Sequence, residues 1–223
     1  MEKSAVERLL VWGAAALLLV SLVACSAQSS PTPEGSFEGR LAQGRDLMDQ
    51  GRYEEAIVDL QAAVRLDPKS VEAHFRLGNA FFQQARHNEA IQAFQKALEL
   101  DQTHVDARSN LGAVYYELGQ FDKAVAEFGK AIGLQPNDAD IHYNLGASYV
   151  QQSKLDAGIA EFMEALRLNP NLGRAYFGLA NAYKLQGNNA LAIEALQKFL
   201  VLGDSDPQLQ TIAESLLAEL KPQ

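Results

Sequence analysis

Few side chains in this sequence could bind a metal or transfer a proton, because it holds four histidines and one cysteine among 223 residues. His74 and His142 are 68 residues apart, with His87 and His104 between them. A zinc site needs several ligands within a few ångströms of one another. The sequence has no His-Glu-x-x-His, Gly-x-Ser-x-Gly or Ser-x-x-Lys motif, and no Gly-rich loop ending in Lys-Ser or Lys-Thr. We predict no metal, no cofactor and no enzyme activity.

The one cysteine, Cys25, follows an uncharged apolar run whose start is preceded by Lys3 and Arg8. The run, residues 9–24, is short for a membrane span, which needs about 20 residues, and its basic start is typical of a secretory signal. Leu-Val-Ala-Cys at residues 22–25 also resembles the lipobox of bacterial lipoproteins. The resemblance implies cleavage before Cys25 and acylation of its thiol. An uncleaved signal anchor and an incidental thiol are the alternatives.

Residues 26–36, SAQSSPTPEGS, have no apolar period and are rich in Ser and Pro, which favours an extended tether. The full chain carries a formal charge of −9, and removal of residues 1–24 takes away two acids and two bases. An acidic body argues against nucleic acid and against binding an anionic lipid surface by charge. A single cysteine also excludes an internal disulfide, so stability must come from apolar packing.

The elements that would position binding side chains are indicated by a regular spacing of small residues along the chain. Leu-Gly pairs recur every 34 residues, and the same register holds a Gln-Gly pair before them and a Leu-Ala pair after them. The pairs are Gln43-Gly44, Leu77-Gly78, Leu111-Gly112, Leu145-Gly146 and Leu179-Ala180. A fixed period of this size indicates an array of stacked units.

Other residue types keep this period. Small residues recur at Ala56, Ala90, Ala124, Gly158 and Ala192, and large apolar residues at Leu60, Phe94, Phe128, Phe162 and Leu196. Pro68, Pro136 and Pro170 close three of the units. This pattern resembles the tetratricopeptide repeat family over residues 37–206. The resemblance implies an all-α, right-handed solenoid of five helix-turn-helix repeats at residues 37–70, 71–104, 105–138, 139–172 and 173–206.

Two departures from the family pattern concern packing. The Trp usual at the fourth position of each repeat is replaced by Arg40, His74, Arg108, His142 and Tyr176, so we expect weaker or wetter packing there. Phe199 stands where the fifth repeat should have a small residue, so something different must pack against it. Residues 207–223 have apolar residues at helical spacing behind Asp206 and Pro207, which predicts a capping helix.

A stripe of side chains remains on the first helix of each repeat once the core positions are assigned. The second, fifth, ninth and twelfth positions centre about 130° from the core positions. In the tetratricopeptide repeat family, which this pattern resembles, the stripe lines a concave groove that holds a peptide or a partner helix. The predicted groove residues, with the adjoining sixth positions, are Arg45, Phe75, Arg76, Asn79, Phe82, Asn110, Tyr116, Tyr143, Asn144, Phe177, Asn181 and Lys184.

Rings in this stripe could hold apolar side chains, and each Asn can both donate to and accept from a peptide backbone. The alternative is that some of the rings pack between neighbouring repeats. The Lys and Asn clamp by which related domains grip a C-terminal carboxylate is not reproduced, since the corresponding positions hold Leu41, Arg45, Arg76, Asp106 and Asn110. Arg45 and Arg76 could still hold an acidic group.

These observations predict a non-catalytic scaffold, lipid-anchored in a bacterial envelope outside the cytoplasm, that binds another envelope protein or peptide in its groove. Its predicted contacts are protein and membrane, with no nucleic acid and no small-molecule substrate. One alternative is a structural envelope protein that self-associates. Another is an enzyme with an unrecognised site, which would need titratable groups that converge in the groove, and the stripe has almost none.

Overall fold

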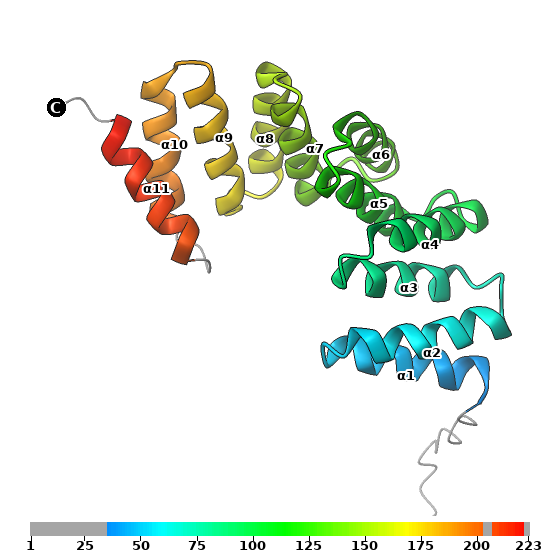
Figure 1. Ribbon diagram of the computed structural model, residues 1–223. Helices are drawn as coiled ribbons and strands as arrows, with labels where there is room; N and C mark the ends of the chain where they lie inside the picture. The colour runs from blue at the N-terminus through cyan, green and yellow to red at the C-terminus, as the bar shows by residue number, and fades with distance from the viewer. Residues whose placement is uncertain (1–34, 203–206, 221–223) are drawn as a thin grey trace, which may run out of the picture. The chain divides into compact units, whose positions relative to one another are not determined.

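The computed structural model describes residues 35–202 and 207–220, and every regular element in these ranges is an α-helix. The helices are α1 (Phe37–Asp49), α2 (Tyr53–Leu66), α3 (Val71–Gln83), α4 (His87–Leu100), α5 (Val105–Glu117), α6 (Phe121–Leu134), α7 (Ala139–Gln151), α8 (Leu155–Leu168), α9 (Gly173–Leu185), α10 (Asn189–Leu202) and α11 (Pro207–Leu220) (Figure 1). No helix of the described ranges is long and apolar enough to cross a membrane.

The chain divides into two units, residues 1–33 and residues 34–223, and all described helices belong to the second. The predicted signal peptide, Cys25 and nearly all of the predicted tether therefore lie outside the described residues, as does Asp206. Within the second unit each helix packs against the next one in the chain, from α1 to α11. This arrangement confirms the predicted all-α fold of helix-turn-helix repeats followed by a C-terminal helix.

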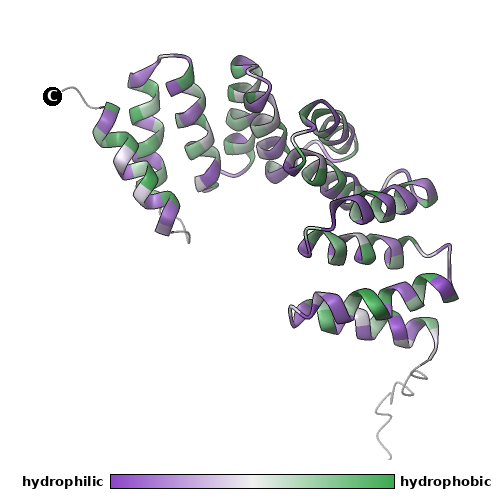
Figure 2. Ribbon diagram, viewed as in Figure 1, coloured by the Kyte–Doolittle hydropathy of each residue, from purple (hydrophilic) through white to green (hydrophobic). Residues whose placement is uncertain are grey.

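The first helices of the repeats share one face of the array. Contacts join α1 to α3, α3 to α5, α5 to α7 and α7 to α9, in addition to the contacts between consecutive helices. We call the surface made by these five helices the first-helix face. Along each helix hydrophobic and hydrophilic residues alternate, as Figure 2 shows, and the hydrophobic ones build the contacts between helices.

Close contact between the two helices of a repeat explains the periodic glycines. A Cβ atom added at Gly78 would lie 2.6 Å from the ring of Phe94, and one at Gly112 would lie 2.9 Å from the ring of Phe128. Both phenylalanines are almost completely buried. Because no larger residue fits between backbone and ring, the Leu-Gly spacing reports the distance between helices.

The turns between the helices of a repeat use a left-handed residue. Gly51, Gly119 and Gly187 have φ between 70° and 79°, which glycine adopts at little cost. In the second and fourth repeats the same place is taken by Ala85 and Ser153, with φ of 54° and 61°. These two turns are therefore strained where the other three are not.

The fourth position of each repeat packs differently from our expectation. Arg108 donates to Glu127 of the second helix at 3.0 Å and to the carbonyl of Gln102 at 2.7 Å. His142 is buried and makes equivalent hydrogen bonds to Glu161 at 2.7 Å and to the carbonyl of Pro136 at 3.0 Å. The expectation of weak, wet packing is wrong for these repeats, because polar partners on the second helix and in the preceding loop replace the Trp.

The last repeat is covered by α11. Phe199 is fully buried, and it belongs to a cluster with Ala213 of α11, against which Leu209, Leu216 and Leu217 also pack. α11 begins 34 residues after α9, so it occupies the register of a sixth first helix. In the five repeats, the first helix has Gly or Ala at the position that contacts the second helix. α11 has the exposed Glu214 at the corresponding position, so this side of α11 faces water.

Candidate functional site

The C-terminal half of the first-helix face contains a hollow between α5, α7 and α9. Its volume is about 660 Å³, and a smaller recess of about 210 Å³ adjoins it between α5 and α7. We call the two together the hollow. Six predicted groove residues line it, together with Ala147, Val150 and Gln151. The six are Tyr116, Tyr143, Asn144, Phe177, Asn181 and Lys184.

The aromatic walls of the hollow are held from behind by buried rings. Tyr143 packs on Phe162 with ring centroids 5.7 Å apart, and Phe177 packs on Phe199 at 5.4 Å. The guanidinium of Arg174 lies 4.6 Å from the centre of the Tyr143 ring and pairs with Asp140. Rings fixed in this way lose little further freedom when they bind a ligand.

The polar groups of the hollow are side-chain amides and one amine. The side-chain amides of Asn144 and Asn181 have no hydrogen-bond partner within the described ranges, so they can serve a bound backbone. Lys184 stands at the edge and donates to Glu219 of α11 at 3.0 Å, in a pair that is exposed to solvent. The hollow is therefore apolar at its walls, with amides between the rings.

The predicted groove residues of the N-terminal half do not form a comparable space. Phe75 packs against the His104 ring with centroids 4.6 Å apart, and Phe82 lies 6.2 Å from the ring of His87. All four rings are partly buried; Phe75 packs at the start of α5, the first helix of the next repeat, and Phe82 packs within its own repeat. In this half the two rings therefore pack against neighbouring side chains and do not border the hollow.

The polar groups of the N-terminal half are also engaged, with one exception. Asn110 donates to Asn79 at 2.7 Å, and Arg76 pairs with Glu72 of its own helix. Arg45 is exposed on α1 and has no ion pair within the described ranges. The two arginines proposed to hold an acidic group are therefore not equivalent, because Arg76 already has an acidic partner.

Comparisons with known proteins agree with this architecture. A tetratricopeptide repeat family model matches residues 41–105 and 148–208, which is more than half of the chain. The chain belongs to the tetratricopeptide repeat (TPR) family. Two further TPR models match residues 113–153 and 93–126. No curated protein matches the sequence.

Several solved TPR structures are similar to this chain. A crystal structure of MamA is 26% identical, with a TM-score of 0.67 over 71% of this chain and 93% of that one. YrrB, described as a TPR protein with an unusual peptide-binding site, is 22% identical with a TM-score of 0.67, over 82% and 93% of the two chains. PilF of Pseudomonas aeruginosa is 22% identical with a TM-score of 0.69, over 82% and 88%. The last two likenesses show the fold alone.

The TPR pattern did not point to every residue that shapes the hollow. At the sixth position, where other repeats have Arg76, Asn110 and Asn144, the fifth repeat has Gly178. A Cβ atom there would lie 2.7 Å from the ring of Phe162, so α9 approaches α8 closely and no side chain fills the space above. The glycine at this position is visible in the sequence and could have indicated an open space beside α9.

The ionisable groups of the described part show no arrangement suited to catalysis. No group of three or more possible metal ligands comes together there, and the four histidines stand on different elements: within α3, at the start of α4, before α5 and within α7. Hydrogen bonds from Arg52 and Arg86 lower the pKa values of Glu55 and Glu89, and a hydrogen bond from Thr103 lowers the pKa of Asp101. These carboxylates lie at the surface and outside the hollow, so their shifts describe surface pairs.

Proposed function

We propose that this TPR chain is a non-catalytic adaptor that binds an extended segment of another protein in the hollow between α5, α7 and α9. The observation that carries the proposal is a space of about 660 Å³ walled by Tyr116, Tyr143 and Phe177. Asn181 lines this space and Asn144 lines the adjoining recess, and their side-chain amides have no partner in the described part. The likeness to YrrB, whose description includes a peptide-binding site, supports the same use of the fold.

The side chains of the hollow suggest how such a segment would bind. Apolar side chains of the segment would enter between the tyrosine rings, where burial contributes about 25 cal/mol for each Å² removed from water. Asn144 and Asn181 would hydrogen-bond its backbone, as an amide can donate and accept at once. An extended segment suits this geometry because successive side chains point to opposite sides, one set inward and one to solvent.

We further propose that the protein is held on an envelope membrane by lipid on Cys25. The support is the basic start, the apolar run and the Leu-Val-Ala-Cys ending at residues 22–25. Each buried CH₂ contributes about 0.8 kcal/mol, so one acyl chain binds weakly and two or three bind firmly. Residues 26–36, at about 3.3 Å each, would let the TPR array stand up to roughly 36 Å from the anchor.

The groove proposal is tested by removing the rings. The double change Tyr116→Ala and Tyr143→Ala should abolish capture of the partner from solubilised envelopes while the helical circular dichroism stays unchanged. Tyr53→Ala, a partly exposed tyrosine on α2 outside the hollow, is the control and should retain capture. Undiminished capture by the double variant would refute the proposal, and loss of helicity would mean that the two rings are core.

The anchor proposal is tested independently. Cys25→Ser should abolish labelling by a fatty-acid analogue and release the protein from the membrane fraction, with Ser26→Ala as the control that keeps both. Labelling that persists in Cys25→Ser would contradict the anchor. The binding hollow does not depend on this result, because the TPR array is a separate unit.

A further inference from the structure

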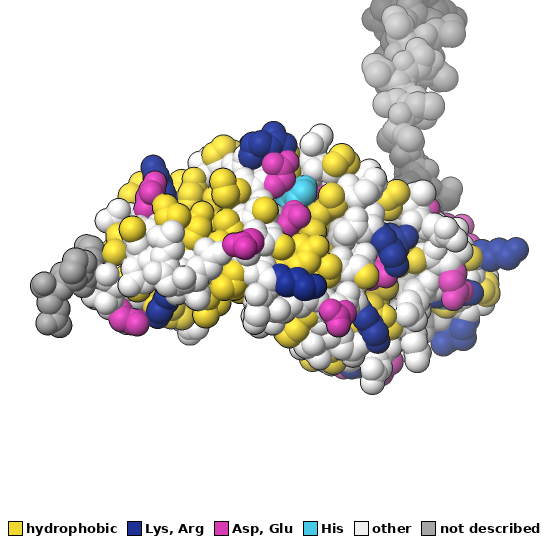
Figure 3. Space-filling model, turned by 90° about the horizontal axis from the view of Figure 1, so that it is seen from above, with side chains coloured by type: hydrophobic (Ala, Val, Ile, Leu, Met, Phe, Trp, Pro, Cys, Tyr) yellow, Lys and Arg dark blue, Asp and Glu magenta, His cyan; other side chains and the backbone are white. Residues whose placement is uncertain are grey.

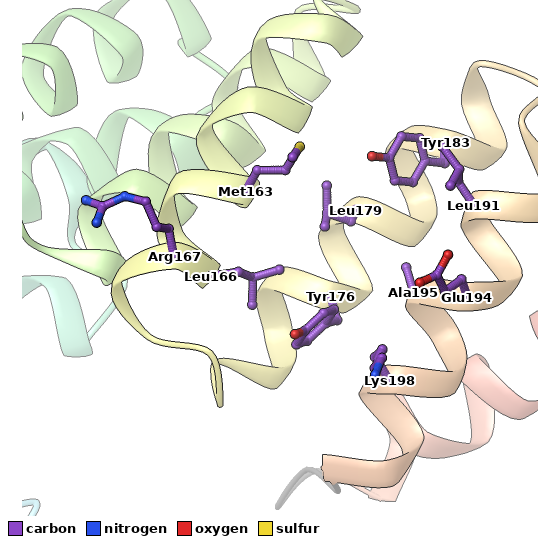
Figure 4. Close-up of a pocket in the computed structure, with 10 residues that line it drawn as sticks. All are labelled: Met163, Leu166, Arg167, Tyr176, Leu179, Tyr183, Leu191, Glu194, Ala195 and Lys198. Carbon is purple, nitrogen blue, oxygen red and sulfur yellow. The ribbon is translucent and has the colours of Figure 1, made fainter.

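The second helices of the last two repeats leave an open cleft between α8 and α10. It has a volume of about 420 Å³, and Figure 4 shows α9 as its floor with α8 and α10 as its walls. Tyr176, Leu179 and Tyr183 come from the floor, Met163 and Leu166 from α8, and Leu191 from α10. The cleft lies on the side of α9 opposite to the hollow, since Phe177, Asn181 and Lys184 line only the hollow.

A change at two positions of the repeat accounts for the exposed apolar surface. In the third and fourth repeats the fourth-position Arg108 and His142 pair with Glu127 and Glu161 of the second helix. In the fifth repeat the corresponding residues are Tyr176 and Ala195, so no ion pair closes the seam. An aromatic ring and a methyl group therefore face the space that polar partners occupy elsewhere.

The rim of the cleft is apolar on both walls and charged beside them. Met163 and Leu191 are 56% and 38% exposed on opposite walls. Hydrophobic side chains also gather over the C-terminal helices at the left of Figure 3. Arg167 is engaged by Glu164, whose pKa it lowers through their hydrogen bond. Glu194 and Lys198 of α10 have no ion pair within the described ranges.

A matching apolar ridge lies on α2, in the first repeat. Val58, Ala62 and Leu66 are spaced four residues apart and so lie along one side of the helix. Val58 and Leu66 are 62% and 53% exposed. The ridge spans about 12 Å and the Leu191–Lys198 wall about 10 Å, at 1.5 Å per helical residue. Arg65 beside the ridge has no ion pair within the described ranges.

We propose that the cleft binds the α2 ridge of a second copy of this chain, in a head-to-tail contact. The charges fit a placement of α2 against α10 in which Arg65 faces Glu194, because neither side chain has an ion pair within the described ranges. Ridge and cleft are different surfaces, so each copy offers one of each and the contact does not close on itself in a pair.

This geometry predicts association that grows with concentration. The soluble fragment of residues 26–223 is suitable for the test, because it keeps the whole unit of residues 34–223 that contains every described helix. Its mass by sedimentation should rise between about 1 μM and about 1 mM, the range of weak, transient contacts. Val58→Lys, which destroys the ridge, and Met163→Glu, which destroys the cleft, should each weaken association at least tenfold.

Mixing the two variants gives the sharpest result. Val58→Lys keeps an intact cleft and Met163→Glu keeps an intact ridge, so an equal mixture should form dimers and nothing larger. Leu134→Lys, at a site 43% exposed on α6 and outside both surfaces, is the matched control and should associate like the parent. A parent that stays monomeric across the range, or a mixture that stays monomeric while the parent associates, would overturn the proposal.

The result is separable from the groove. The double change Tyr116→Ala and Tyr143→Ala alters only the hollow, so it should leave the concentration-dependent mass unchanged. If that double variant also became monomeric, the contact would run through the hollow and the ridge-to-cleft assignment would be wrong. A monomeric parent that still captures its partner would leave the proposed function intact.

Discussion

The two halves of the first-helix face are built from the same repeat, but the N-terminal half is closed by its own side chains and the C-terminal half is open. In the N-terminal half the side chains satisfy one another, as the hydrogen bond between Asn110 and Asn79 and the stacking of Phe75 on His104 show. In the C-terminal half the corresponding positions leave a space of about 660 Å³ with its adjoining recess, and two side-chain amides without partners in the described part. The repeat backbone therefore provides the face, and the residues at a few positions decide whether it is open.

Two local causes explain the difference. The sixth position shrinks from Asn144 to Gly178 between the fourth and fifth repeats, and the ninth position shrinks from Asn79 to Ala113 and Ala147. Small residues in both places remove the atoms that would otherwise bridge adjacent first helices. The buried cores beneath are similar, with Phe94 and Phe162 both below 3% exposure, so the contrast resides in the surface layer.

The largest expected effect concerns the glycine that is special to the open half. Gly178→Ala should lower the free energy of unfolding by about 1–2 kcal/mol, because overpacking against Phe162 outweighs the gain in helix propensity. Gly129→Ala on α6 has nothing within 4 Å of the new Cβ and should raise stability instead. Chemical denaturation measures both, and equal shifts of the same sign would remove the steric explanation of the hollow.

Exchanging the matched asparagines sharpens the comparison further. Asn79→Ala should lower the free energy of unfolding by about 1 kcal/mol, because it breaks the hydrogen bond from Asn110. Asn181→Ala should change it by less than about 0.5 kcal/mol, because no intramolecular bond is lost. The affinity for the partner should respond in the reverse order. Similar stability losses at both sites would mean that Asn181 is engaged after all.

Replacing the left-handed residue in one turn of each half should change the stability of the protein equally. Ala85→Gly and Ser153→Gly should each raise the free energy of unfolding by about 0.5 kcal/mol, since relief of the left-handed strain exceeds the entropy cost of glycine. Thermal and chemical denaturation check this. A gain at only one site would show that the halves also differ in their backbone.

The smallest effect is expected at the edge of the hollow. Glu219→Gln removes the partner of Lys184, but both side chains are exposed, so stability should change by less than about 0.5 kcal/mol. A titration of unfolding at two salt concentrations would measure the difference. A loss well above this value would indicate that the pair, and not the apolar contacts of Leu209 and Leu216, holds α11 in place.

The fold was predictable because it depends on packing that repeats. A glycine that faces a phenylalanine, as at Gly78 and Phe94, recurs at a fixed spacing in the sequence. A phenylalanine at position 199, where a small residue was expected, indicated the extra helix. The fourth position was predicted wrongly, since the partners of His142 come from another helix and from a loop 6 residues earlier. Such pairs are visible in sequence only when both positions are considered together.

The sequence could predict which residues share the first-helix face, but not which part of that face contains the hollow. Helical periodicity identifies which residues share the first-helix face, and it assigned Phe75 and Phe177 to the same stripe. Whether a ring packs against the next repeat or borders a hollow depends on its neighbours in space, such as His104 beside Phe75 and Gly178 beside Phe177. The predictions for residues 1–34, including Cys25, concern residues outside the described ranges and stay predictions.

The most direct test of the account places one photo-crosslinking residue in each half. At position 181, bordering the hollow, ultraviolet light on intact envelopes should yield one discrete adduct, which disappears when Tyr143→Ala is added. At position 79, in the closed half, the same probe should yield no such adduct. An adduct at position 79 equal to that at position 181, or one at position 181 that survives Tyr143→Ala, would contradict the claim that the open half binds the partner.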